Sequence, residues 1–136
     1  MAQSYLLAFL GEAYGGDGQP EAGLQVLDEA LAAVRDTGER MYEAELYRLK
    51  GELLRMRSTD HTAVAETCLH QALTIACRQQ AKSLELRAAM SLARLWQQQG
   101  KRAEAHALLT PIYDWFTEGF DTADLQDAKA LLDTLA

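Results

Sequence analysis

The sequence is poor in the residues that interrupt or cross-link a chain. Its 136 residues include only two prolines and two cysteines, and aromatic residues make up 7%. Alanine and leucine are abundant and β-branched residues are few, which favours helices over strands. No apolar run reaches the roughly 18–20 residues of a membrane span, and the N-terminus lacks the pattern of a secretory signal. We therefore expect a cytoplasmic, all-α protein with a single domain.

Basic residues are also scarce. The formal net charge is −7, and residues 1–40 contain seven acids against two bases. Binding to a nucleic-acid backbone needs clustered lysine and arginine, and the sequence has no such stripe. We expect neither a nucleic-acid partner nor a membrane partner.

The two cysteines, Cys68 and Cys77, are nine residues apart. Nine residues place them on opposite faces of one helix, so they cannot form a disulfide with each other. Two unpaired thiols suit a reducing cytosol, and we interpret both as small buried apolar residues.

Apolar residues recur every three or four positions and predict seven helices. Their approximate ranges are 3–14, 20–35, 40–57, a fourth after the turn at 58–60, 82–98, 101–116 and 121–135. The apolar face of the third extends to Met56, and Gly100 turns the chain between the fifth and sixth. Pro111 falls inside the sixth helix, where we expect a kink or a local break. Asp121 or Thr122 is expected to cap the last helix.

Alternate helices carry the same pattern of small and large residues. The first helix of each pair has a small residue at Gly11, Gly51 and Ala93, followed three residues later by Tyr14, Leu54 and Trp96. The second helix has Gly23, Ala65 and Ala105, each followed four residues later by Leu27, Leu69 and Leu109. A small residue lets two helices approach, and a large one fills the remaining space. The chain therefore contains an internal repeat.

This pattern resembles the tetratricopeptide repeat, with a period of 40–42 residues in place of the usual 34. The resemblance implies an all-α, right-handed α-solenoid of three helical hairpins plus a C-terminal capping helix. The repeats would span about residues 4–38, 39–80 and 81–116, and the capping helix about 121–135, all within one domain of residues 1–136.

Residues 111–122 and 125–132 resemble the C-terminal regions of bacterial signalling proteins, in particular ATPase-linked and adenylate-cyclase-associated ones. The resemblance implies a non-catalytic protein–protein interaction module, the regulatory or scaffolding part of a larger signalling or transcription-regulating protein. The alternative is self-association as a homodimer, or intramolecular docking, because Leu6, Phe9 and Leu10 of the first helix have no helix before them to cover them.

No pattern typical of an enzyme is present. The turn Gly15-Gly16-Asp17-Gly18 lacks the Gly-Lys-Ser/Thr ending of a phosphate loop and the spaced acids of a calcium loop. His61, His70 and His106 have no partners at metal-ligand spacing, and no serine lies in a nucleophile elbow. We predict no catalytic residues, no metal and no cofactor.

In the tetratricopeptide family the first helix of each hairpin lines a concave groove that receives a protein or peptide. The matching positions here are Tyr5, Phe9, Glu12, Arg48, Glu52, Arg55, Arg87, Arg94, Gln97 and Gln98, with Ala8, Glu45, Leu49, Met90 and Ser91 beside them. Arginines in a groove favour an acidic or mixed-charge segment. The alternative is ordinary exposed charges paired along a helix, such as Arg48 with Glu52.

Aromatic residues gather late in the chain, at Trp96, Tyr113, Trp115, Phe116 and Phe120. One interpretation is a buried contact between the third repeat and the last helix. The other is that Trp115 or Phe120 stays exposed as an anchor for a partner or for a second copy. The sequence leaves both open.

Overall fold

A computed structural model describes residues 20–37, 43–57, 62–120 and 122–136, and these ranges are helical without any strand. The helices are α2 (Pro20–Thr37), α3 (Glu43–Arg57), α4 (Thr62–Arg78), α5 (Lys82–Gln98), α6 (Arg102–Asp114) and α7 (Ala123–Leu135). The all-α class is therefore confirmed. The predicted first helix, with Tyr5, Phe9 and Glu12, lies outside the described residues, as does Asp121. Among the helices described, none has the length and apolar character to cross a membrane.

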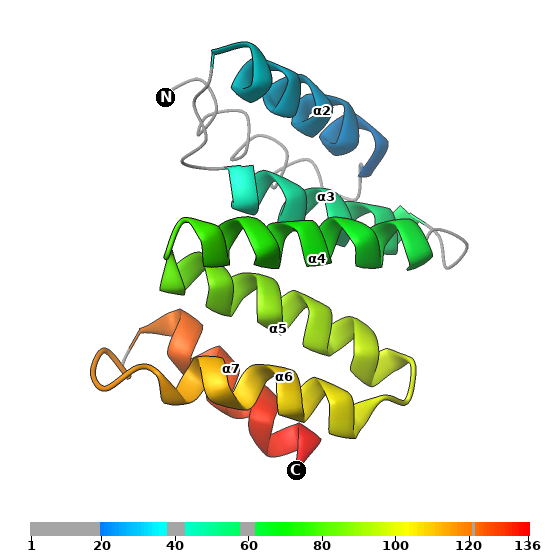
Figure 1. The fold of residues 1–136 in the computed structure, drawn as a ribbon. Helices are drawn as coiled ribbons and strands as arrows, with labels where there is room; N and C mark the ends of the chain where they lie inside the picture. Colours follow the sequence, from blue (N-terminus) through cyan, green and yellow to red (C-terminus); the bar gives the residue numbers. More distant parts are fainter. Residues whose placement is uncertain (1–19, 38–42, 58–61, 121) are drawn as a thin grey trace.

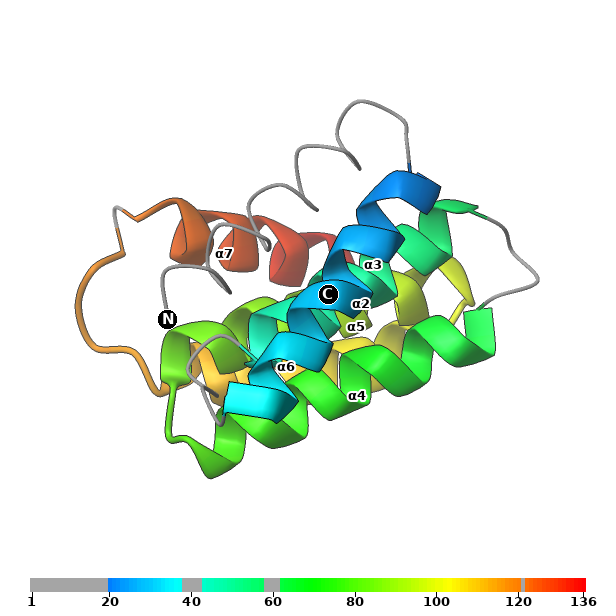
Figure 2. The ribbon, with the colours of Figure 1, turned by 90° about the horizontal axis from the view of Figure 1, so that it is seen from above.

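Each helix packs against the next one along the chain, and the helices descend through the molecule from α2 to α5, with α6 and α7 side by side below α5 (Figure 1). Two further contacts skip a helix: α3 touches α5, and α5 touches α7. Seen from above, α4 and α6 lie toward one side of the molecule and α7 toward the other (Figure 2). The odd-numbered helices α3, α5 and α7 therefore share one face, called here the odd-helix face.

Most of the repeated small and large positions that the structure describes are buried, and Trp96 is partly buried. Leu27, Leu69 and Leu109 have no exposed surface, and the small residues Ala65, Ala93 and Ala105 are equally inaccessible. Gly51 of α3 lies against α4 so closely that a Cβ atom there would stand 2.8 Å from Leu69 Cγ and 3.0 Å from the Ala65 carbonyl oxygen. The predicted pairing of a small residue with a bulky one is confirmed at this contact.

Two predicted core residues are exposed. Met56, in the last turn of α3, is 52% exposed, and Cys77 is exposed whereas Cys68 is buried. Both thiols are free, as predicted from their positions on opposite faces of α4. The expectation that both are buried was wrong for Cys77, because opposite faces of one helix have different neighbours. Helical periodicity marks a face, but it does not show how far along the helix its neighbours cover that face.

The turns after α4 and α5 share one backbone arrangement. Gly100 has φ of 80°, its N–H donates to the Gln97 carbonyl, and the Lys101 N–H donates to the Trp96 carbonyl. This is the Schellman ending, which favours glycine at the left-handed position. Gln80 takes the same place after α4, with φ of 55°. Its N–H donates to the Cys77 carbonyl, and the Ala81 N–H donates to the Ala76 carbonyl.

We expect Gln80→Gly to stabilise the protein by about 0.5–1 kcal/mol. A left-handed L-residue costs about 1–2 kcal/mol, and the greater freedom of glycine in the unfolded chain offsets part of the gain. Thermal and urea denaturation followed by circular dichroism would measure it. The opposite change at the matched position, Gly100→Gln, should destabilise, and equal stability for all three proteins would contradict the argument.

The end of α6 departs from the expected boundary. α6 continues through Pro111 and ends at Asp114, so the proline does not break the helix, which nevertheless stops one turn later. Upstream of the proline, the Thr110 hydroxyl donates to the His106 carbonyl at 2.8 Å. Thr122 is the N-cap residue of α7 by its extended backbone, without a capping side-chain hydrogen bond. The shorter α6 leaves residues 115–120 as a connector.

Candidate functional site

The odd-helix face carries a chain of ion pairs that joins three helices. Glu45 of α3 accepts two hydrogen bonds from Arg48, at 2.7 Å from Nε and 3.0 Å from Nη2. Arg87 of α5 donates to the same carboxylate at 2.8 Å and, through Nε, to Asp124 of α7 at 2.8 Å. Arg87 is therefore the link between α3 and α7, and its charge is committed to carboxylates of its own chain.

These contacts shift the titration of Glu45, whose side chain is 11% exposed. Burial by itself raises the pKa of this carboxyl, but the hydrogen bonds and charges of Arg48 and Arg87 outweigh it and bring the pKa below its ordinary value of 4.5. The folded-state pKa is thus lower than the unfolded one. The carboxylate stabilises the fold above about pH 4.5, and that contribution is lost as the pH falls through the depressed pKa.

We expect Glu45→Gln to cost about 1–3 kcal/mol at neutral pH, because charge-assisted hydrogen bonds are lost and two arginines lose a counter-charge. The difference from the wild type should shrink on acidification, since protonation removes the same interaction from the wild type. Urea unfolding at several pH values between about 7 and 3 would measure both proteins. Glu29→Gln, at an exposed position of α2, is the control. A Glu45→Gln difference that is independent of pH would contradict this interpretation.

Three further predicted residues of this face, Glu52, Arg55 and Gln97, also have side-chain partners. Arg55 pairs with Glu52 at 2.7 Å, and Gln97 lies 3.4 Å from the Thr134 hydroxyl of α7. Arg94 is half-buried, and Gln98 is exposed. Within the described chain, Glu52 Oε1 and Arg55 Nε are buried without a hydrogen-bond partner.

Two expectations about the groove predicted from the sequence are wrong. Arg48 is hydrogen-bonded to Glu45, three residues before it, and not to Glu52. Leu49, Met90 and Ser91, expected to line the groove, are buried, and Arg48 Nη1 lies 3.4 Å from the Ser91 hydroxyl. The physical reason is that the odd helices pack against one another, so these side chains face a neighbouring helix.

Trp96 makes a contact that the sequence analysis missed. Its indole N–H donates to Glu66 of α4 at 2.6 Å, and the His70 ring lies 6.0 Å from it, centroid to centroid. Glu66 and His70 are four residues apart and therefore share a face of α4. Trp96 is thus a packing residue between α4 and α5.

The other late aromatic residues divide between the two interpretations. Tyr113 and Phe116 are partly buried against the core cluster of α5, α6 and α7. Trp115 is 57% exposed and Phe120 46%. Residues 115–120, together with the first turn of α5, form a surface called here the aromatic edge.

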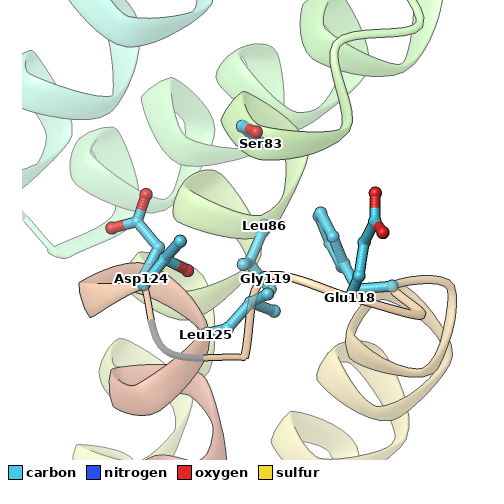
Figure 3. Close-up of a pocket in the computed structure, with 8 residues that line it drawn as sticks. Ser83, Leu86, Glu118, Gly119, Asp124 and Leu125 are labelled. Atoms are coloured by element: carbon cyan, nitrogen blue, oxygen red, sulfur yellow. The ribbon is translucent and has the colours of Figure 1, made fainter.

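A surface pocket of about 230 Å³ lies beside the aromatic edge. Leu86, Phe116 and Leu125 provide its apolar walls, and Ser83 and Glu118 provide polar groups. Figure 3 shows Ser83 on α5 above the connector, with Glu118 and Asp124 on either side. Asp124 is already bound to Arg87, whereas Glu118 is exposed.

Neither thiol is activated for chemistry. Burial raises the pKa of Cys68, and burial together with the charge of Glu85 raises the pKa of Cys77. A raised pKa reduces the thiolate fraction, which is the nucleophilic form. Within the described ranges, the histidine, cysteine and carboxylate side chains form no group of three that could hold a metal ion.

The sequence matches no protein-family model and no curated protein at a significant level. The odd-helix face is a set of neutralised ion pairs suited to holding helices together. The aromatic edge has exposed aromatic rings, a small pocket and an exposed carboxylate, which suit the binding of another macromolecule.

Proposed function

We propose that this chain is a non-catalytic protein–protein interaction module, built as a right-handed α-solenoid of three helical hairpins and a capping helix. The packing supports the proposal: α3 contacts its hairpin partner α4 and also α5 of the next hairpin, and α5 contacts α6 and α7. Units of a helical-repeat protein pack in this way, each on its neighbours in the stack.

The observation that carries the proposal is the equal burial of equivalent positions. Leu27, Leu69 and Leu109 each occupy the same place in the sequence repeat, and each is fully buried. In a repeat stack every unit buries the same side of its hairpin against its neighbours, and the opposite surfaces are left for partners. The resemblance to bacterial signalling proteins adds that this module would serve a larger protein as a regulatory or scaffolding part.

The charges of the odd-helix face disfavour an acidic partner at that face. Arg48 and Arg87 are already bound to Glu45 and Asp124, so an acidic segment would have to displace carboxylates of the same chain. Trp115 and Phe120 are exposed, and the ammonium group of Lys82 lies 5.4 Å from the centroid of the Trp115 ring. Aromatic side chains on a rigid scaffold are the residue types that contribute most to protein–protein binding.

Defined peptides test this proposal. The purified chain would be titrated with three labelled amphipathic peptides, composed of leucine with lysine, with glutamate or with glutamine, while sedimentation velocity records its mass. We expect a monomer that binds at least one peptide saturably, with micromolar affinity and one-to-one stoichiometry. A chain that dimerises at micromolar concentration and binds none of them would contradict the proposal and favour self-association.

A further inference from the structure

We propose that the aromatic edge binds a basic, apolar segment of a partner protein. This inference rests on the proposed interaction function and specifies its surface and the chemistry of its partner. Trp115 and Phe120 are among the few large apolar side chains exposed in the described part of the chain, whereas Leu109 and Ile112 of the adjoining helix are buried.

The exposed rings are braced by neighbouring aromatic side chains. Trp115 meets Phe116 edge to face, with ring centroids 5.2 Å apart, and Phe120 lies 5.9 Å from Tyr113. Phe116 and Tyr113 in turn pack against the core cluster. Rings held in this way lose little conformational entropy when a partner covers them, which suits a binding anchor.

The charge of this region specifies the partner. Residues 103–128 contain no lysine and no arginine. They contain six carboxylates, of which Asp114, Glu118, Asp121 and Asp124 lie within four residues of the segment 115–120, whereas Glu104 belongs to the first turn of α6. Only Asp124 among the described ones is bound to an arginine, Arg87. Lys82 of the same edge is paired with Glu85, and the exposed carboxylates of Asp114 and Glu118 give the surface an excess of negative charge. A surface that combines exposed aromatic rings with an excess of negative charge is complementary to a segment that combines apolar and basic residues.

A lysine of the chain itself illustrates this chemistry. Lys82 reaches from α5 so that its ammonium lies 5.4 Å from the centroid of the Trp115 ring, and it also pairs with Glu85 at 3.1 Å. The indole is therefore already a partner for an ammonium group. Because Trp115 remains more than half exposed, a second basic side chain can approach the open part of the ring.

The pocket beside the edge offers a place for such a side chain. Its walls of Leu86, Phe116 and Leu125 suit the aliphatic stem of a lysine or arginine. Glu118 borders the same pocket with an exposed carboxylate that can accept a charge-assisted hydrogen bond (Figure 3). The pocket and the two rings would thus take a basic residue and its apolar neighbours from one segment.

Fluorescence anisotropy with the labelled leucine–lysine and leucine–glutamate peptides would test this inference on the full chain. We expect the lysine peptide to bind in preference to the glutamate peptide. Trp115→Ala and Phe120→Ala should each weaken that binding at least about tenfold, the effect of removing an interface anchor. Glu118→Gln should weaken it several-fold at low salt and less at high salt. Circular dichroism would verify that each variant keeps its helical content and melting temperature.

Met56→Ala is the matched control, because Met56 is similarly exposed but lies on α3, outside the aromatic edge. It should leave binding unchanged. Lysine-peptide binding that is equally strong in the Trp115 and Phe120 variants would overturn the aromatic edge while leaving the interaction function standing. Binding of only the glutamate or glutamine peptide would do the same. Binding of no peptide would overturn both proposals.

Discussion

Replacing Leu69 by alanine should lower the free energy of unfolding by about 2–5 kcal/mol, the range for emptying a well-packed core site. Leu69 has no exposed surface, and it stands where α4 meets Gly51 of α3. The loss combines the transfer free energy of the removed carbons with a cavity that two closely approaching helices cannot easily fill. Urea denaturation followed by circular dichroism would give the value.

Val64→Ala is the control for this substitution, since Val64 belongs to the same helix and is about half exposed. It should change stability by no more than about 0.5 kcal/mol. Leu109→Ala, at the equivalent position of the sequence repeat, should cause a similarly large loss. A Leu69→Ala cost as small as that of Val64→Ala would show that Leu69 does not fill the contact between α3 and α4.

Replacing Gly51 by valine should cost about 3 kcal/mol, the upper part of the range for overpacking a core. Even the first added carbon would lie 2.8 Å from Leu69 Cγ and 2.9 Å from Leu69 Cδ2. The Ala65 carbonyl oxygen at 3.0 Å belongs to the backbone of α4 and cannot move without moving the helix. The helices must therefore separate, and thermal denaturation should detect the loss.

Ala107→Val provides the comparison, because Ala107 is exposed near the middle of α6. There the β-branched side chain should cost only about 0.5 kcal/mol through its lower helix propensity. If valine at position 51 were tolerated as well as valine at position 107, the close approach of α3 and α4 would be wrong.

Much of the fold could be predicted from the sequence, and the reasons are local. The range of α5 was predicted as observed, because its apolar residues repeat strongly and Gly100 supplies a left-handed ending. The end of α6 was misplaced by two residues, because Phe116 continues the apolar pattern of Leu109 and Ile112 beyond the last helical residue, Asp114. Met56 was expected to be buried but is exposed, because the burial of a residue at a helix end depends on the lengths of the neighbouring helices.

The candidate site was less predictable, because it depends on which helices meet. The sequence placed Arg48 and Arg87 on equivalent helices, but their shared partner Glu45 lies 42 residues from Arg87. Asp124, the other partner of Arg87, belongs to a third helix. Exposure of Trp115 could not be settled either, since the same aromatic residue type serves cores and interfaces.

The double variant Gly51→Ala/Leu69→Ala tests most directly the claim that matched small and bulky residues nest the paired helices. We predict that Gly51→Ala destabilises the wild-type chain much more than the Leu69→Ala chain, where the contacts with Leu69 Cγ and Cδ2 are gone and the Ala65 carbonyl oxygen at 3.0 Å remains. The measurement is the free energy of unfolding of all four proteins under one condition. An effect of Gly51→Ala that is the same in both backgrounds, within about 0.5 kcal/mol, would contradict the claim.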